Sequence, residues 1–144
     1  SYSAFFILLS IKLFIIIFTI VIKNDKLLLA YSNNKRAWYL PGGKIETDEL
    51  PQQSLVREIW EELTLKIDVK LLKYYCHIAP AYGEDENLIM EQDCYLYELH
   101  ENISPNNEIG AIKFFDSYSY QQEPAQVIGV LQIFKRLKAD GLVS

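Results

Sequence analysis

Long apolar runs alternate with short polar stretches in the first part of the chain. From Leu13 to Ile22 the residues are almost all apolar, and most are β-branched or aromatic, which favours a buried strand. The polar segment Lys23–Lys26 has the composition of a turn, and a second apolar run, Leu27–Tyr31, follows it. Two apolar runs joined by a short turn predict a buried β-hairpin.

The spacing of the apolar residues becomes helical after the turn Pro41–Gly43. Between Pro51 and Leu63 they recur every three or four positions, and Pro51 suits the first position of a helix. We therefore predict a helix over residues 51–63. The side expected to face the core carries Leu55, Val56, Ile59, Trp60 and Leu63.

The second half of the chain predicts three more strands and one more helix. The strand-like runs are residues 69–78, 88–99 and 111–116, and a tyrosine-rich loop is expected after the last of them. A helix is expected within residues 124–141, because a stripe of apolar residues precedes basic last turns and Gly141 can cap the end. The chain contains no linker and no shift in composition, so we expect residues 1–144 to form one domain. The mixture of strands and helices predicts an α/β fold with a mixed β-sheet between helices.

The run Ala4–Ile22 contains a single charged residue, Lys12, and a membrane-spanning helix is therefore an alternative for it. If Leu13–Ile22 forms a strand, about eight apolar residues remain, which is far short of the ~20 that a span requires. We expect no membrane association, and a membrane-attached protein stays open as the weaker alternative.

Net charge and cysteine content restrict the partners and the compartment. The chain has 144 residues and a net charge of -5, and its basic residues are scattered, so polymeric nucleic acid is not an expected partner. Cys76 and Cys94 lack the spacing of a zinc site and are too few for a disulfide scaffold. We expect two reduced thiols in or near the core and a cytoplasmic protein.

Three carboxylates crowd one edge of the predicted helix. At 100° per residue, Glu58, Glu61 and Glu62 fall within about 100° of arc, where like charges repel. One interpretation is a solvated acidic face whose charge is offset by Arg57 and Lys66. The other is a site for a hard divalent cation, Mg²⁺ or Mn²⁺, to which the preceding Gly-Gly turn adds backbone groups. The residues alone leave both interpretations open.

The spacing around these glutamates resembles the signature of the Nudix (MutT-like) hydrolases, G-x5-E-x7-R-E-U-x-E-E-x-G-U, in which U is aliphatic. Gly43 is followed after five residues by Glu49, and after seven more by Arg57-Glu58-Ile59-Trp60-Glu61-Glu62-Leu63-Thr64-Leu65. The resemblance extends over residues 13–141 and implies the Nudix-type α/β/α sandwich.

Two positions depart from the family pattern. Thr64 replaces the second signature glycine, and Asp48 stands where the family often has glycine. A residue directly after a helix commonly adopts positive φ, which costs β-branched Thr ~1 kcal/mol or more. We expect a reshaped helix end at Thr64 and a working metal site, because neither change removes a ligand.

The resemblance implies a Mg²⁺- or Mn²⁺-dependent enzyme that cleaves the pyrophosphate bridge of a nucleoside diphosphate linked to another group. Glu58, Glu61 and Glu62 would be metal ligands, the carbonyl of Gly43 would complete the shell, and one glutamate would act as general base. Arg57 would orient the glutamates, and Glu49 would support the loop and helix. The alternative is a catalytically weak Nudix-fold module that binds nucleotides or regulates.

Candidates for substrate binding lie outside the signature. By the same resemblance, Glu108 is the best-placed further acidic residue. An aromatic face can stack on any base, and the candidates for this role are Tyr39, Tyr82, Tyr95 and Tyr118. Pro80 and Tyr82 point to different substrate classes within the family, so nucleoside triphosphates, ADP-ribose and related conjugates all stay open, as does a homodimer.

Overall fold

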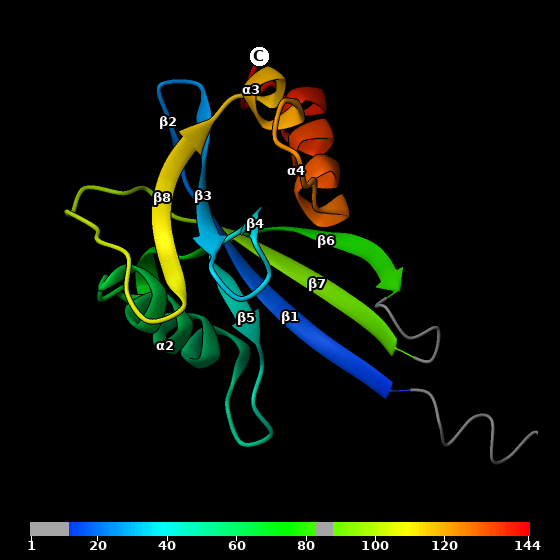
Figure 1. Ribbon diagram of the computed structural model, residues 1–144. Helices are drawn as coiled ribbons and strands as arrows, with labels where there is room; N and C mark the ends of the chain where they lie inside the picture. Colours follow the sequence, from blue (N-terminus) through cyan, green and yellow to red (C-terminus); the bar gives the residue numbers. More distant parts are fainter. Residues whose placement is uncertain (1–11, 83–87) are drawn as a thin grey trace, which may run out of the picture.

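The computed structural model describes residues 12–82 and 88–144, whose strands form two four-stranded sheets (Figure 1). Sheet A has the strand order β5 (Gly42–Lys44), β1 (Lys12–Ile20), β7 (Leu88–Leu96) and β6 (Lys73–Tyr82). Strands β1 and β7 are parallel, and the other neighbours are antiparallel. Sheet B is antiparallel, with β3 (Lys26–Ser32) paired to β2 (Ile22–Lys23), β4 (Ala37–Tyr39) and β8 (Ile109–Phe115).

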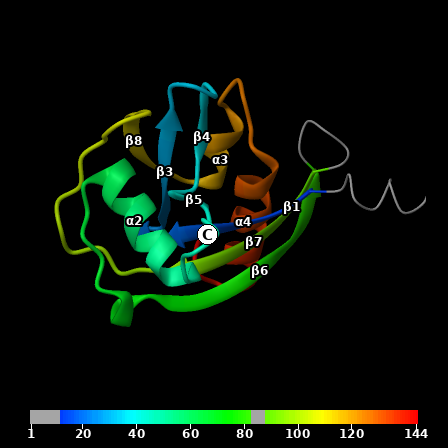
Figure 2. The same cartoon turned by 90° about the horizontal axis from the view of Figure 1, so that it is seen from below.

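Helices cover both faces of sheet A. Helix α2 (Pro51–Leu63) packs on one face, and α4 (Ile128–Ala139) packs on the opposite face (Figures 1 and 2). The shorter helices are α3 (Ser117–Gln121) and the 3₁₀ turn η1 (Val69–Leu71). The predicted α/β class with a mixed sheet between helices is confirmed, and sheet B is an addition to it.

The predicted hairpin exists, but its first strand is divided between the two sheets. The turn residues Asn24 and Asp25 have φ of 53° and 66°, as in the two-residue turns that match strand twist. The carbonyl of Val21 accepts a hydrogen bond from the Leu28 N–H at 2.9 Å. Before Val21 the chain pairs with β5 and β7 instead. One apolar run therefore contributes strands to both sheets.

Strand β3 is buried on both faces, because it passes between two hydrophobic clusters. Leu27 and Leu29 belong to the cluster on the α4 side, and Leu28 and Ala30 belong to the cluster on the α2 side. This explains why β3 reads as a continuous apolar run rather than an alternating one. Cys76 and Cys94, both free and buried, lie on the α4 side, which confirms the expectation of two reduced core thiols.

The helix predictions were right for α2 and incomplete for the C-terminal region. Helix α2 has the predicted bounds, whereas α4 begins at Ile128, later than the region from Pro124 suggested. Residues Ser117–Gln121, predicted as loop, form α3, whose first turn is capped by the Asp116 side chain. Gly141 follows α4 with φ of 72°, so the predicted cap is confirmed.

Among the residues that the structure describes, no helix combines the length and the hydrophobicity that crossing a bilayer would require. The part of the N-terminal run before Lys12 lies outside the described residues. Leu13 and the residues after it are in β1, as the strand interpretation predicted.

Candidate active site

The buried face of α2 is rotated from the predicted one, and the rotation places a carboxylate in the interior. Counting 100° per residue from Glu58, the predicted apolar face spans about 60° to 200°. The residues found buried span about 320° to 140°, namely Ser54, Leu55, Ile59, Glu62 and Leu63. The prediction that Trp60 faces the core was wrong, since Trp60 is 53% exposed, whereas Glu62 is only 8% exposed.

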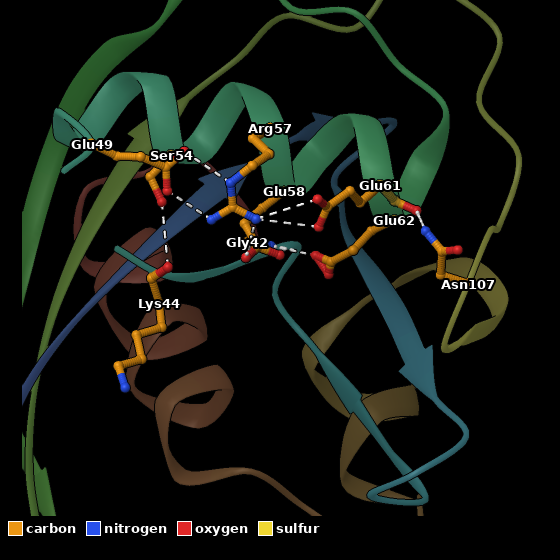
Figure 3. Close-up of polar contacts among 9 residues, drawn as sticks. All are labelled: Gly42, Lys44, Glu49, Ser54, Arg57, Glu58, Glu61, Glu62 and Asn107. Atoms are coloured by element: carbon orange, nitrogen blue, oxygen red, sulfur yellow. Dashed lines mark hydrogen bonds and ion pairs between the residues drawn. The ribbon is translucent and has the colours of Figure 1, made fainter. Parts of the chain in front are cut away.

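Gly43 of β5 allows this rotation, because it presents α2 with backbone that carries no side chain at the point of contact. A Cβ at Gly43 would lie 2.6 Å from Cδ of Glu58. Gly42 has φ of +147°, and a Cβ there would lie 2.1 Å from the Ile17 carbonyl oxygen. The helix therefore approaches β5 on its carboxylate side, and the glutamates come to lie over the glycine turn (Figure 3).

Arg57 connects three of the signature glutamates. Its Nε and Nη2 donate to the two carboxylate oxygens of Glu49, each at 2.8 Å. Its Nη1 donates to Oε1 of Glu58 at 3.1 Å and to Oε2 of Glu61 at 3.3 Å. The paired bonds to Glu49 fix the plane of the guanidinium group, and this orients the third nitrogen toward Glu58 and Glu61 (Figure 3).

Glu62 lies apart from this network. Its Oε1 accepts a hydrogen bond from the Gly42 N–H at 2.9 Å. Among the described residues, no lysine, arginine or histidine forms an ion pair with Glu62. On the same side of α2, the hydroxyl of buried Ser54 donates to the Lys44 carbonyl at 3.3 Å, which ties the helix to the end of β5.

Burial raises the pKa values of the two glutamates nearest the glycine turn, Glu58 and Glu62. It raises the pKa of Glu62 to about 8, although the Gly42 N–H acts in the opposite direction. Burial also raises the pKa of Glu58, and Arg57 partly counters this. Hydrogen bonding to Arg57 lowers the pKa of Glu49, and the same bond raises the pKa of Arg57. Glu58 and Glu62 thus lack full charge compensation from the protein.

The C-terminal end of α2 is held by a segment far along the chain, Ser104–Glu108, which we name the capping loop. The N–H groups of Ser104 and Asn106 donate to the carbonyls of Leu63 and Glu62, each at 3.0 Å. The side-chain amide of Asn107 donates to the Glu61 carbonyl at 2.8 Å. These carbonyls are among those that a helix leaves without donors of its own.

Thr64 keeps the left-handed conformation that a glycine would take at this position, with φ of 56° and ψ of 36°, so the predicted reshaping of the helix end was wrong. Its N–H donates to the Trp60 carbonyl at 3.1 Å, and its hydroxyl donates to the Ser104 carbonyl at 3.3 Å. The predicted strain is therefore present, and a bond to the capping loop accompanies it.

Glu108 lies at the end of the capping loop and close to the glutamates of α2. Its Oε2 accepts a hydrogen bond from Nδ2 of Asn34 at 3.1 Å, and its carbonyl accepts one from the Asn33 N–H at 2.9 Å. The charge of Glu108 is a further cause of the raised pKa values of Glu58 and Glu62. The structure thus brings this predicted residue to the edge of the glutamate cluster.

Three of the tyrosines predicted to bind a base have described side chains, and these three lie on different elements. Tyr39 ends β4 and is partly buried, with Nζ of Lys35 at 4.9 Å from its ring centroid. Tyr95 packs edge-on against Tyr74 on sheet A, with ring centroids 5.5 Å apart. Tyr118 is 75% exposed on α3. The side chain of Tyr82, the last residue of β6, lies outside the described part of the structure.

The glutamates are near one another but are not arranged as a closed metal cage. In residues 12–82 and 88–144, no group of three acidic, histidine or cysteine side chains is already arranged to hold a metal ion. Arg57 draws the carboxylates of Glu58 and Glu61 to itself, whereas Glu62 points at the Gly42 N–H.

Several residues that contact the signature residues were not predicted from the sequence, among them Gly42, Ser54 and Asn107. Gly42 belonged to a recognised turn, but its N–H could be assigned to Glu62 only once the two elements were packed. Asn107 lies in a Pro-Asn-Asn segment typical of turns, and its partner is 46 residues away in the sequence. No local pattern connects such a pair.

Comparisons with known proteins agree with the geometry. Residues 14–130 match the model of the NUDIX domain. A MutT-like protein of Streptomyces ambofaciens is 39% identical over 51 residues, which are 35% of this chain and 33% of that protein's length. The solution structure of the E. coli ORF135 protein has a TM-score of 0.68 at 25% identity and covers 91% of this chain and 94% of that one.

A third similar protein has been solved with ligands. It is a bifunctional NMN adenylyltransferase/ADP ribose pyrophosphatase from Francisella tularensis, complexed with AMP and a manganese ion. Its TM-score is 0.68 at 18% identity, and the match covers 96% of this chain and 47% of that chain.

Proposed function

Because the chain belongs to the NUDIX family of MutT-like hydrolases, we propose that it is a divalent-cation-dependent hydrolase of small nucleotides. Its substrate would be a nucleoside diphosphate linked to another group, such as a nucleoside triphosphate, ADP-ribose or a related conjugate. Water would add to one phosphorus of the pyrophosphate bridge while the bond to the bridging oxygen breaks. The products would be a nucleoside monophosphate and phosphate, pyrophosphate or a phosphorylated group.

The observation that carries this proposal is the burial of Glu62, which has no ion-pair partner among the residues that the structure describes. A carboxylate that is 8% exposed and has a pKa of about 8 is costly to keep charged. A solvated acidic face, the alternative explanation of the cluster, would leave its carboxylates in water. The residues instead fit a hard cation, because Glu58, Glu61 and Glu62 would offer it carboxylate oxygens and its charge would compensate the buried carboxylate of Glu62.

The proposed cation site has the carboxylates of Glu58, Glu61 and Glu62 as ligands, with the Gly43 carbonyl as a further oxygen. A Mg²⁺ or Mn²⁺ ion bound there would neutralise phosphate charge and lower the pKa of a coordinated water. The Francisella protein, whose structure contains AMP and a manganese ion, supports the choice of ion and ligand class.

The protein's own groups would orient the site and accept a proton. Arg57 holds Glu58 and Glu61 on one side, while its bonds to Glu49 keep the guanidinium plane fixed. One glutamate of the cluster, or Glu108 beside it, would take the proton released by the attacking water. Tyr39 is the proposed stacking partner for the base, since it lies three residues before Gly42.

The test is a screen of the purified protein with Mg²⁺ against a panel of nucleotides, detecting phosphate or pyrophosphate release. Hydrolysis should disappear with a chelator and return with excess Mg²⁺ or Mn²⁺. Glu61→Gln should lower turnover ~10²-fold or more, because a charged oxygen ligand or base is lost while the size is kept.

Glu98→Gln is the matched control, because the Glu98 side chain is 87% exposed and pairs only loosely with His100, at 3.4 Å. It should hydrolyse nucleotides at the wild-type rate. Full activity in the presence of chelator, or equal rates for Glu61→Gln and wild type, would show that the proposal is wrong. Binding of nucleotides without turnover would favour the non-catalytic module instead.

A further inference from the structure

The capping loop satisfies the last carbonyls of α2 through two kinds of donor. Ser104 and Asn106 use their backbone N–H groups, which any residue except proline could supply. Asn107 uses its side-chain amide, at 2.8 Å from the Glu61 carbonyl. Of these donors, only the one from Asn107 depends on residue type.

The backbone of Asn107 also restricts the residue type. Its φ of 52° lies in the left-handed region, which asparagine tolerates better than most residues. Glycine would accept this φ but would supply no amide, and alanine would lack both properties. The position therefore requires a residue that can adopt positive φ and donate a hydrogen bond from a short side chain.

Glu108 directly follows Asn107 in the sequence. The hydrogen bond from the Asn107 side-chain amide to the Glu61 carbonyl therefore fixes the backbone position from which the Glu108 side chain extends. On its other side, Glu108 is held by Asn33 and Asn34 in the loop between β3 and β4. The hydrogen bond from Asn107 thus connects the capping loop to the end of α2, and the bonds from Asn33 and Asn34 connect it to the β3–β4 loop. Glu108 lies between these two connections.

We infer that Asn107 is a positioning residue, which ties the capping loop to the last turn of α2 and thereby holds Glu108 beside the proposed cation site. The inference rests on the proposed function, because it assigns Glu108 a role toward the cation held by Glu58, Glu61 and Glu62.

The test is a double-mutant cycle read out as Mn²⁺ affinity, measured by titrating the metal-free full chain without nucleotide. Asn107→Gly keeps the positive φ and removes the amide, and it should weaken Mn²⁺ binding about tenfold. Glu108→Gln should weaken binding to a similar extent. When both changes are combined, Asn107→Gly should have less than about a twofold further effect, because the carboxylate through which it acts is already gone.

The matched control is Asn24→Gly, the same substitution at another asparagine of similar φ, 53°, in the β2–β3 turn. It should bind Mn²⁺ like wild type. Asn34→Ala removes the bond on the other side of Glu108 and should weaken binding in the same non-additive way.

Each outcome decides the inference. If Asn107→Gly weakens binding equally with and without Glu108, or does not fold, Asn107 serves the fold and the inference is wrong. Wild-type affinity in Asn107→Gly would overturn it as well, even where nucleotide hydrolysis supports the proposed function. Conversely, a wild-type chain that binds Mn²⁺ but hydrolyses no nucleotide would refute the function, while the cycle would still decide the role of Asn107.

Discussion

At the scale of single residues, Glu62 has the strongest link between position and chemistry. It shares a helix face with leucine and isoleucine, and its hydrogen bond from Gly42 only partly replaces the water that it has lost. The protein thus keeps an acid where an apolar residue would pack without this cost. Such a residue makes the stability of the metal-free protein depend on pH.

The first prediction concerns this pH dependence in the presence of chelator. The pKa of Glu62 is raised from 4.5 to about 8 in the folded protein. Between these values the folded state binds a proton that the unfolded state releases, so the free energy of unfolding should fall as pH rises from about 4.5 to about 8. Melting curves of wild type and Glu62→Gln across this range should show a flatter dependence for the variant. Equal slopes would contradict the assigned pKa.

A second prediction concerns Thr64, which is strained but bonded. Thr64→Gly would remove the strain, yet it would also lose the bond to Ser104 and add freedom to the unfolded chain, so its stability should stay close to wild type. Thr64→Asn tolerates the left-handed backbone without that freedom and should raise the free energy of unfolding by roughly 0.5–1 kcal/mol. Denaturant titration can rank the three proteins. A destabilised Thr64→Asn would mean that the threonine contacts outweigh the strain.

At the scale of elements, the sequence predicted what local pattern determines. Pro51 and the helical spacing defined α2 to the residue, and the β-branched run ending at Ile22 defined a strand. The rotation of α2 escaped prediction, because it depends on how closely the helix approaches Gly43 in another element. The cap from Asp116 onto Ser119 was a local signal for α3 that the tyrosine-rich composition concealed.

The candidate site likewise contains residues that local sequence spacing predicted and residues that only the packing of separate segments brings together. The spacing of the signature identified Glu49, Arg57 and the three glutamates of α2, because these residues lie within 14 positions of one another. The partners that orient them, Gly42 and Asn107, come from other segments. Their contacts arise only from packing, and a single sequence contains no pattern for them.

The third prediction belongs to strand β5. Gly42→Ala would push a Cβ into the Ile17 carbonyl and displace the Gly42 N–H that donates a hydrogen bond to Glu62. It should therefore lower the free energy of unfolding by about 3 kcal/mol or more and abolish turnover. Gly141→Ala is the control, because its φ is also positive but its Cβ would meet nothing within 4 Å. It should cost only ~1 kcal/mol and leave turnover unchanged. Similar losses in both would show that φ alone matters.

At the scale of the whole molecule, the proposed cation and the fold should stabilise each other. If Mn²⁺ binds the folded chain only, a concentration 100 times its dissociation constant should add ~2.7 kcal/mol to the free energy of unfolding. The melting temperature should rise accordingly in wild type and rise less in Glu61→Gln. Sodium chloride at equal ionic strength serves as the control, and an equal rise with it would assign the effect to general screening.

The capping of α2 by residues more than 40 positions later has a consequence for cooperativity. Hydrogen bonds from Ser104 and Asn106 to the last turn of α2 break when either partner opens. The capping loop and the end of α2 should therefore unfold as one unit, although loops commonly open independently of helices. In native-state hydrogen exchange, the amides of Ser104 and Asn106 should share the opening free energy of the Thr64 amide. Opening of the capping loop and fraying of the last turn of α2 would then be the same opening equilibrium.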